Sequence, residues 1–379
     1  MNIGILYPRS GAHPELMVDY MDGLKTSLKR QGLDKQIQLF SESVGFGGLE
    51  KEVYEKAEKL ILLEKVDVVV AYVDLRVAPV LEPLMTKSGK LLLIVNPGAN
   101  YTDNWAPQEG TIYLTLQHAF LSWLSGSMAG KMDNKNGLYA TTFYDCGYMH
   151  GASMLRAFTA GGGNITFNYI NNQAYDKFDI LQLTDFLSTN KETTNLLCVM
   201  DALPASLLYK LLNKEENAKA LHLFVSPMML QQEALKDIED GFEFAVDGYL
   251  PWMIAQENAS NKVFVTFYKE QTKRDASIFS LLGWETGLVL KAIIEAGITD
   301  RKKIIDDLAE IKIDSPRGAL KLDAPTNHFV APLHKCSLKK GSSKLKTTLL
   351  EDINAEWKTF SALPSEGPSS GWSNTYLCY

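Results

Sequence analysis

One stretch of the sequence, residues 66–102, restricts the fold more than any other. Residues 66–70 form a β-branched apolar run that only Asp67 interrupts, residues 91–95 are a second apolar run, and residues 77–85 between them can form a short helix. This order predicts a strand, a crossover helix and a second strand. Strands that are apolar on both faces are typical of a parallel sheet covered on both sides. In such a sheet, the loops that leave the carboxyl ends of the strands line a crevice. These loops are residues 71–76 and 96–101.

Composition indicates an ordinary globular protein and excludes several classes. The chain has 379 residues, of which 46% are hydrophobic, which is enough for two separate cores. A net charge of -7 argues against a nucleic-acid partner, because no basic face is expected from that balance. The four cysteines show no CxxC spacing, so no zinc site is expected. A bridge between Cys336 and Cys378, or buried free thiols, are the two alternatives for these side chains.

The order of the apolar runs indicates that the same alternation of strands and helices occurs twice along the chain. Strands are predicted at 3–7 and 37–40, with helices at 16–31 and 50–63, and a strand at 138–142 opens a second series. Because no Ser/Gly-rich linker separates the two series, we expect an α/β protein of two doubly wound, Rossmann-like parallel-sheet lobes that share a cleft. The later predicted helices are 152–160, 205–212, 263–272 and 280–295, and the later predicted strands are 164–169, 196–200, 221–225, 246–250, 318–322 and 332–338.

Five segments, in order along the chain, carry a family resemblance. They are IGILYPRSGAHPELMVDYMDGLKTSLKRQG, VDVVVAYVDLRVAPVLEPLMTKSGKLLLIVNPGANYT, LYATTFYDCGYMHGASMLRAFTAGGG, FSLLGWETGLVLKAIIEAG and SPRGALKLDAPTNHF. The chain thereby resembles type I periplasmic substrate-binding proteins of ABC transporters, in the branch of leucine/isoleucine/valine-binding receptors and their amide-binding relatives. The resemblance implies a Venus flytrap fold, in which three crossovers join two lobes and a ligand is bound between them.

The resemblance also implies domain boundaries. Lobe 1 is expected to comprise residues 1–116 and 250–326, and lobe 2 residues 117–249 and 327–360. Residues 361–379 are rich in Ser, Pro and Gly and are predicted to form an extended C-terminal tail.

An amino-acid-like ligand requires groups that hold its carboxylate. Hydroxyl groups and backbone N–H groups near helix starts serve this purpose. Gly98, Ala99 and Asn100 can offer such N–H groups, whereas Pro97 cannot. The predicted ligand-binding residues are Arg9, Ser10, Asp74, Leu75, Arg76, Pro97, Gly98, Ala99, Asn100, Tyr148, Asp201 and Trp284.

The ligand's ammonium group requires an acceptor, and Asp201 and Asp145 are the candidates. Tyr148 stands where the family's loop in lobe 2 places an aromatic lid. The loop after the third strand departs from the family, because it offers Tyr72, Asp74 and Arg76 in place of the family's Ser or Thr. Arg9 and Arg76, if both face the cleft, can form bidentate pairs with a carboxylate and so favour an anionic ligand.

Several of these residues have a structural alternative. Asp74 and Arg76 can form a solvated ion pair at a helix start. Tyr148 and Trp284 can be core residues, since Trp284 lies on the apolar stripe of a predicted helix. Asp201 can cap the helix that follows it.

The sequence contains no motif of a known catalytic site in its expected context. It lacks HExxH, a Walker loop and a GxGxxG after a strand, and its GxSxG match, GPSSG at residues 367–371, lies in the Ser-, Pro- and Gly-rich tail rather than between a predicted strand and helix. His328 is expected to hydrogen-bond near a crossover rather than to bind a metal, because no other ligand stands at metal spacing. We therefore predict a receptor that is not an enzyme and needs no cofactor.

The resemblance gives this receptor two partners, a small amino-acid-like ligand and the membrane permease of an ABC transporter. Because a strand begins at Ile3, we expect either a periplasmic or lipid-anchored protein whose leader was removed, or a cytosolic one. The alternatives are an amide or amino-acid sensor domain that regulates a partner protein, and an α/β enzyme with a cleft between its lobes.

Overall fold

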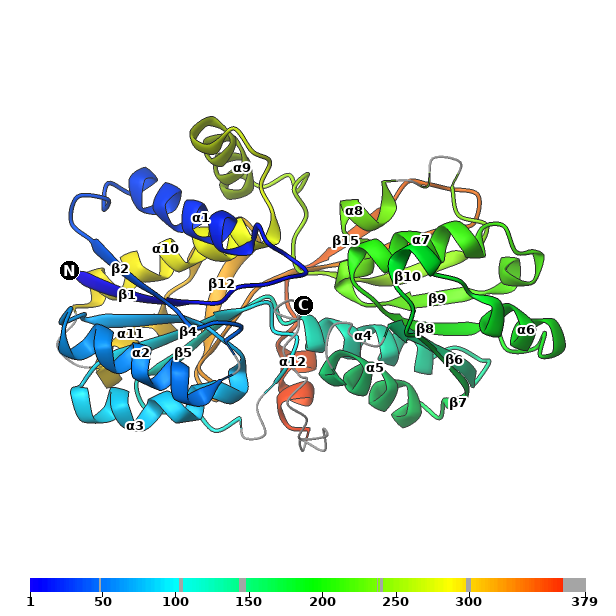
Figure 1. Ribbon diagram of the computed structural model, residues 1–379, viewed down its shortest axis with the longest axis horizontal. Helices are drawn as coiled ribbons and strands as arrows, with labels where there is room; N and C mark the ends of the chain where they lie inside the picture. The colour runs from blue at the N-terminus through cyan, green and yellow to red at the C-terminus, as the bar shows by residue number, and fades with distance from the viewer. Residues whose placement is uncertain are drawn as a thin grey trace.

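The computed structural model describes residues 1–47, 49–101, 105–142, 148–236, 238, 241–297 and 301–363. The chain forms two α/β lobes that lie side by side and are joined at a narrow waist (Figure 1). The predicted fold class is confirmed, since each lobe is built on one sheet with a parallel centre and helices on its faces.

The first sheet has eight strands in the order β11-β12-β13-β5-β4-β3-β1-β2. The strands from β13 to β2 are parallel, whereas β11 and β12 are antiparallel at one edge. Strands β3 and β4 are buried along their whole length, as their apolar sequence predicts. The bounds are β1 (Asn2–Tyr7), β2 (Gln38–Ser43), β3 (Val68–Tyr72), β4 (Leu91–Asn96), β5 (Thr111–Thr115), β11 (Ile313–Ser315), β12 (Gly318–Asp323) and β13 (His328–Val330).

Two groups of helices cover this sheet, one on each face, and each encloses its own core. On one face, α1 and α10 pack closely, because the glycines at their contact leave no room for a side chain. A Cβ added at Gly283 in α10 would lie 1.9 Å from the carbonyl oxygen of Tyr20 in α1. The helices are α1 (Leu16–Arg30), α9 (Ala259–Thr272), α10 (Ile278–Ala296) and α11 (Arg301–Glu310) on that face, and α2 (Glu50–Leu62) and α3 (Ala78–Ser88) on the other.

The second sheet has seven strands in the order β15-β14-β10-β9-β8-β6-β7. Strands β14 and β15 are antiparallel and the other five are parallel. The strands are β6 (Asn136–Thr142), β7 (Asn164–Asn171), β8 (Asn195–Val199), β9 (His222–Val225), β10 (Ala245–Leu250), β14 (Leu333–Leu338) and β15 (Lys346–Leu350). The helices are α4 (His118–Gly130), α5 (Tyr148–Ala160), α6 (Leu181–Thr189), α7 (Ala202–Leu212) and α8 (Gln232–Leu235).

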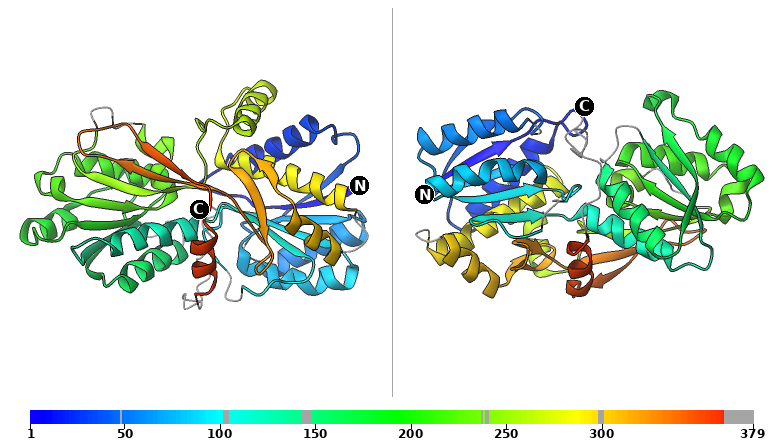
Figure 2. Two further views of the ribbon diagram at one scale, coloured as in Figure 1. Left: turned by 180° about the vertical axis from the view of Figure 1, so that it is seen from behind. Right: turned by 90° about the horizontal axis from the view of Figure 1, so that it is seen from below.

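The chain crosses between the lobes three times. The crossovers lie between β5 and α4, after β10, and between β13 and β14. Strand β13 pairs with β5 and β12 in the first sheet, so the third crossover lies after residue 330, a few residues beyond the predicted boundary at 327. A last helix, α12 (Asn354–Ser361), lies at the waist between the lobes in both views of Figure 2.

A buried ion pair stands next to the first crossover. The guanidinium of Arg317 donates to both carboxylate oxygens of Glu285, over 2.9 and 2.8 Å, and its third nitrogen donates to the carbonyl oxygen of Thr115 over 3.2 Å. Arg317 is 2% exposed and Glu285 is fully buried. The bidentate geometry and the extra acceptor compensate for the loss of water around both charges.

Several elements of the C-terminal part are absent from the sequence-based prediction, namely α11, β11, β13, β15 and α12. Nearly all of the predicted tail, from residue 364 onward, lies outside the described residues. Of the cysteines, Cys198 and Cys336 are buried free thiols, whereas Cys146 and Cys378 lie outside the described part of the chain. No helix within the described ranges is long and apolar enough to cross a membrane.

Candidate functional site between the lobes

The rims of the two lobes meet at the waist. Strand β1 runs toward the second lobe and ends at the waist (Figure 1), and the loop after it carries Ser10 and His13. On the other side, β8 ends next to Asp201, which precedes α7. Each loop follows the carboxyl end of a strand, which is where doubly wound sheets bind ligands.

A hydrogen bond joins these rims directly. The Nε2 atom of His13 lies 3.0 Å from Oδ2 of Asp201, and its Nδ1 lies 3.3 Å from Oε1 of Glu15. The hydroxyl of Ser10 accepts the backbone N–H of His13 over 2.9 Å, which fixes the loop. The imidazole also packs edge-on against Phe279, with ring centroids 5.3 Å apart. The contact therefore connects lobe 1, through His13, with lobe 2.

The environment of His13 favours its charged form. Burial lowers the pKa of His13, but the hydrogen bonds and negative charges of Asp201 and Glu15 outweigh burial and raise this pKa to about 9. The hydrogen bond from His13 in turn lowers the pKa of Glu15. At neutral pH the ring is therefore an imidazolium that donates from both nitrogens, one to each carboxylate.

Asp201 also performs the structural role that the sequence offered as an alternative. It is the N-cap of α7, and its Oδ1 accepts the backbone N–H of Ala202 over 2.7 Å. One carboxylate thus caps a helix with one oxygen and contacts the opposite lobe with the other. Capping fixes the side chain in place, so Asp201 presents a positioned negative charge to His13 of the opposite lobe.

The loop after β4 is held by its own hydrogen bonds. Asn96 donates to the carbonyl of Val73 over 2.8 Å and accepts the backbone N–H of Gly98 over 2.7 Å. The carbonyl oxygens of Pro97 and Gly98 accept the first N–H groups of α4. The N–H of Gly98, predicted as a ligand donor, is therefore already engaged, and the loop serves as a cap for the helix that opens lobe 2.

Only glycine fits at position 98. Its φ is +74°, and an added Cβ would lie 2.6 Å from the backbone nitrogen of Gln117. The loop therefore packs backbone to backbone against the first crossover. Beyond it, the Nδ2 of Asn100 donates to Oδ2 of Asp74, so the two predicted residues after β3 and β4 meet. Both are buried, and Asp74 is thus no solvated surface residue.

The structure brings predicted residues together in two separate groups. Asp74 and the loop from Pro97 to Asn100 form one wall, and Ser10 reaches Asp201 through His13. Leu75 and Ala99 are buried on the same rim. The side chains of Arg76 and Tyr148 and all of Asp145 lie outside the described residues.

Of the two remaining predicted residues, Arg9 is exposed beside Ser10 and Trp284 is buried in the core. The Arg9 side chain is exposed, and its backbone N–H donates to the carbonyl of Gly45 over 2.6 Å. Trp284 is 4% exposed and packs against Phe264 and Phe267 in the core of lobe 1. The assignment of Trp284 to the ligand site is thus corrected, because the apolar stripe of α10 turns its indole into the core.

His13 is the main site residue that the sequence analysis missed. A weak signal was present, because a histidine in a polar loop directly after a strand stands at the ligand-facing edge of a doubly wound sheet. Its partner is 188 positions away in the sequence, so only the fold shows the contact. Among the described residues, no group of three or more His, Cys, Asp or Glu side chains is arranged to hold a metal ion.

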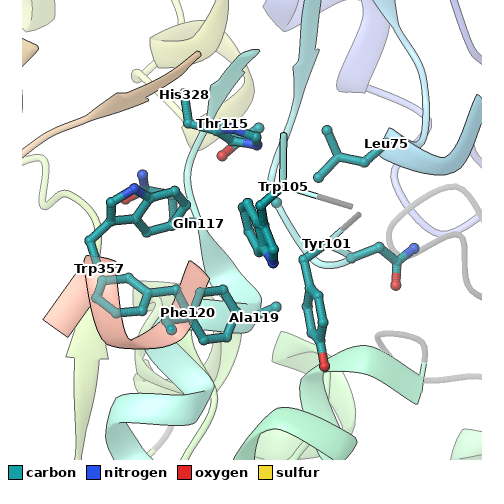
Figure 3. A pocket seen from close by; sticks show the side chains of 12 residues that line it. Leu75, Tyr101, Trp105, Thr115, Gln117, Ala119, Phe120, His328 and Trp357 are labelled. Carbon is teal, nitrogen blue, oxygen red and sulfur yellow. The ribbon is translucent and has the colours of Figure 1, made fainter. Parts of the chain in front are cut away.

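A pocket lies beside the loop after β4, at the junction of the lobes, and we call it the hinge pocket. The space between its walls is about 210 Å³ when the part open to solvent is included, and the room inside it is about 10 Å³, which is that of one water molecule. Figure 3 shows the indole of Trp105 in its middle, with Trp357 and Phe120 on one side and Tyr101 on the other. Its lining residues are Leu75, Gly98, Asn100, Tyr101, Trp105, Thr115, Gln117, Ala119, Phe120, His328, Trp357 and Phe360.

His328 in this pocket does as the sequence predicts. Its Nδ1 bonds to the carbonyl oxygen of Thr326 over 2.8 Å, next to the third crossover. Its ring stacks on Tyr113, with centroids 4.3 Å apart. The histidine is therefore packed and hydrogen-bonded near a crossover.

Two lobes with rims in contact and three crossovers define the class of two-lobed solute-binding proteins. The chain belongs to the periplasmic binding protein family, whose model matches residues 1–342. This result confirms the resemblance seen in the sequence. No curated protein matches the chain.

Several solved structures with a similar fold are solute-binding or substrate-binding proteins of ABC transporters. One, from Rhodopseudomonas palustris BisB5 in complex with 3,4-dihydroxybenzoic acid, is 20% identical, with a TM-score of 0.67, and the match covers 93% of this chain and 96% of that one. A substrate-binding protein from Sphaerobacter thermophilus is 13% identical, with a TM-score of 0.73 and coverages of 93% and 98%. The branched-chain amino acid binding protein LivJ from Streptococcus pneumoniae, in complex with isoleucine, is 14% identical, with a TM-score of 0.64 and coverages of 93% and 99%. These likenesses show the fold.

Proposed function

We propose that this protein is an extracytoplasmic receptor that captures a small carboxylic acid, an amino acid or a related compound, between its lobes and delivers it to the permease of an ABC transporter. The observation that carries the proposal is the contact of His13 with Asp201, which places a cation and an anion on opposite rims of one cleft in this family's fold.

The two charges suit the two ends of an amino acid. The imidazolium of His13 can pair with a carboxylate, and the carboxylate of Asp201 can accept hydrogen bonds from an ammonium group. A ligand that enters the open cleft thus replaces a contact between the lobes with two contacts of its own. Two relatives of this fold were solved with carboxylic acids, isoleucine in one and 3,4-dihydroxybenzoic acid in the other, which supports a carboxylate as the common feature.

Closure follows from the differential affinity of the ligand for the two arrangements. A ligand that contacts both rims binds the closed form more tightly and shifts the population toward it. The movement is a hinge motion that the three crossovers absorb, near residues 114–118, 248–252 and 330–333. The permease then distinguishes the loaded from the empty receptor by the positions of the lobes.

A thermal-shift screen tests ligand binding. The full chain is heated with amino acids, dicarboxylates, hydroxybenzoates and neutral amides, because a ligand that binds only the folded state raises the melting temperature by mass action. We expect carboxylates to stabilise the protein and matched neutral amides to have no effect. The D201N variant should lose the preference for ligands that carry an ammonium group. Equal stabilisation by charged and neutral ligands would contradict the proposed roles of His13 and Asp201.

A second experiment tests delivery. Uptake of a radiolabelled ligand is measured in cells that contain the transporter, with and without this protein. We expect uptake only when the receptor is present. Binding without uptake would indicate the sensor alternative, and chemical conversion of the bound compound, followed by mass spectrometry, would indicate an enzyme.

A further inference from the structure

Helix α12 contacts both lobes at the waist (Figure 2). The centroid of the Phe360 ring lies 5.2 Å from that of Tyr101 and 5.7 Å from that of Trp105, both of which belong to the lobe 1 segment between β4 and β5. The same ring lies 5.3 Å from Phe120 and 6.0 Å from Trp123, which belong to α4 of lobe 2. One side chain of α12 therefore packs against both halves of the molecule.

Trp357, one turn earlier in α12, repeats this arrangement. Its ring lies 5.3 Å from that of Trp105 and 5.6 Å from that of His328, which are lobe 1 residues, and 5.5 Å from that of Phe120 in lobe 2. Trp357 and Phe360 are both buried. Aromatic rings at such separations attract each other beyond the effect of their buried area, so both side chains stabilise the angle between the lobes that is seen here.

Helix α12 is anchored on lobe 2. Strand β15 pairs with β14 over its whole length, and only residues 351–353 separate it from α12. In this turn, the carboxylate of Asp352 accepts the backbone N–H of Asn354 over 3.0 Å, and Ile353 is buried in the same apolar cluster as the two aromatic side chains. Because this short connection keeps α12 with lobe 2, a change in the angle between the lobes acts on the contacts of α12 with lobe 1.

The contacts lie next to two of the three crossovers. Phe120 is in the first turn of α4, directly after the first crossover, and His328 opens β13, which leads into the third. Packed contacts are sensitive to small shifts, because a gap of about 0.5–1 Å loses roughly a quarter to a half of the attraction between two atoms. A rotation of the lobes about these crossovers must therefore break or rearrange the packing of α12 on lobe 1.

We propose that α12 is a strap across the hinge, which is anchored on lobe 2, packs Trp357 and Phe360 against lobe 1, and thereby sets the balance between the angle seen here and more open arrangements. The inference goes beyond the proposed function, because it concerns the receptor without a solute and holds for any ligand of the cleft. Helix α12 lies outside residues 1–342, which match the family model, so the strap adds a restraint to the hinge that the matched segment contains.

Distances between spin labels on the two lobes test the strap. The labels are attached through T86C on α3 in lobe 1 and T159C on α5 in lobe 2, both at exposed positions, in the full chain with the two cysteines outside the described residues changed to serine. Double electron–electron resonance without solute should give one main distance when α12 is unchanged. We expect W357A and F360A each to shift the population away from that distance on the order of tenfold, because each loses two ring contacts with lobe 1.

The matched control is F244A. Phe244 is also fully buried, but its contacts with the rings of Tyr209 and Phe242 lie within lobe 2, so F244A should keep the distance of the unchanged protein. Thermal unfolding shows whether each variant is folded, and F360L, a milder change with an effect in the same direction, replaces F360A if that variant does not fold.

Two results would overturn the strap. One is that the folded α12 variants keep the distance of the unchanged protein, and the other is that F244A shifts the population as much as they do, since the effect would then come from general loosening. Because no solute is present, the outcome does not depend on the ligand or on delivery to a permease, and a failure of the proposed function is therefore distinguishable from a failure of the strap.

Discussion

Replacing Asp201 by asparagine removes the negative charge that faces His13 from the other lobe and keeps the size of the side chain. The carbonyl oxygen of the new amide can still cap α7 and accept a hydrogen bond, so the fold of lobe 2 is retained. The variant therefore isolates the charge in the contact between the lobes, where Nε2 of His13 lies 3.0 Å from Oδ2 of Asp201.

The size of the effect follows from the pKa of His13. A rise from 6.5 to about 9 corresponds to about 3 kcal/mol that favours the protonated form in the folded protein. The folded-state pKa is the higher one, so this stability is fully present below pH 6.5 and is lost as the pH rises through 9. Because Glu15 remains beside the ring in the variant, we expect D201N to lose about 1–2 kcal/mol of unfolding free energy at pH 7.

Two measurements check this prediction. Denaturant unfolding at pH 6, 7, 8 and 10 should show a deficit in D201N that is full at pH 6 and nearly absent at pH 10. Proton NMR should show that His13 titrates near pH 9 in the unchanged protein and at lower pH in D201N. A deficit of equal size at pH 6 and pH 10, or a normal pKa of His13 in the unchanged protein, would refute the reasoning.

A matched control comes from a second histidine–aspartate pair. Nε2 of His222 lies 2.6 Å from Oδ2 of Asp247, and both residues belong to lobe 2, on β9 and β10. D247N therefore removes a similar charge without affecting the contact between the lobes. Small-angle X-ray scattering should show a larger radius of gyration for D201N than for the unchanged protein, and no such change for D247N.

Three further predictions concern the scaffold. R317M leaves the carboxylate of Glu285 buried without its partner and should cost about 3–5 kcal/mol in denaturant unfolding. G283A forces a Cβ to 1.9 Å from a backbone oxygen of α1 and should cost about 1–3 kcal/mol. With the other two cysteines changed to serine, Cys198 and Cys336 should resist a thiol reagent at pH 8 until the protein unfolds, because burial raises the pKa of both thiols, that of Cys336 to about 12.

Controls separate these effects from general damage. The double variant E285Q/R317M removes both charges and should be more stable than R317M alone; equal stability would mean that lost packing, not the unpaired charge, causes the deficit. K291A on the exposed face of α10 should lie within about 0.5 kcal/mol of the unchanged protein. Rapid labelling of either buried thiol in the native state would contradict its burial.

The sequence predicts the sheets well but the site only in part. The sheets depend on local sequence patterns, whereas the site depends on contacts between residues that are far apart in the chain. Strands β3 and β4 follow from local apolar runs, because a fully buried strand leaves its pattern in five or six consecutive residues. The contact of His13 with Asp201 depends on two loops that meet only after both lobes have folded. For Trp284, in contrast, the local sequence was sufficient, because the apolar stripe of the predicted helix already indicated that its side chain packs in the core. Helix α12 lies beyond the segments that carry the resemblance. Its aromatic residues Trp357 and Phe360 line the hinge pocket, and only the folded structure shows this position.

Gln117 has a consequence for how the lobes move. It adopts a φ of +57° at the first crossover, and its side-chain amide donates to the carbonyl of Phe329 at the third crossover over 3.1 Å. This hydrogen bond ties two of the three connecting segments to each other. We therefore expect them to move together when the lobes change their relative position, so that the loss of this hydrogen bond should widen the range of that motion.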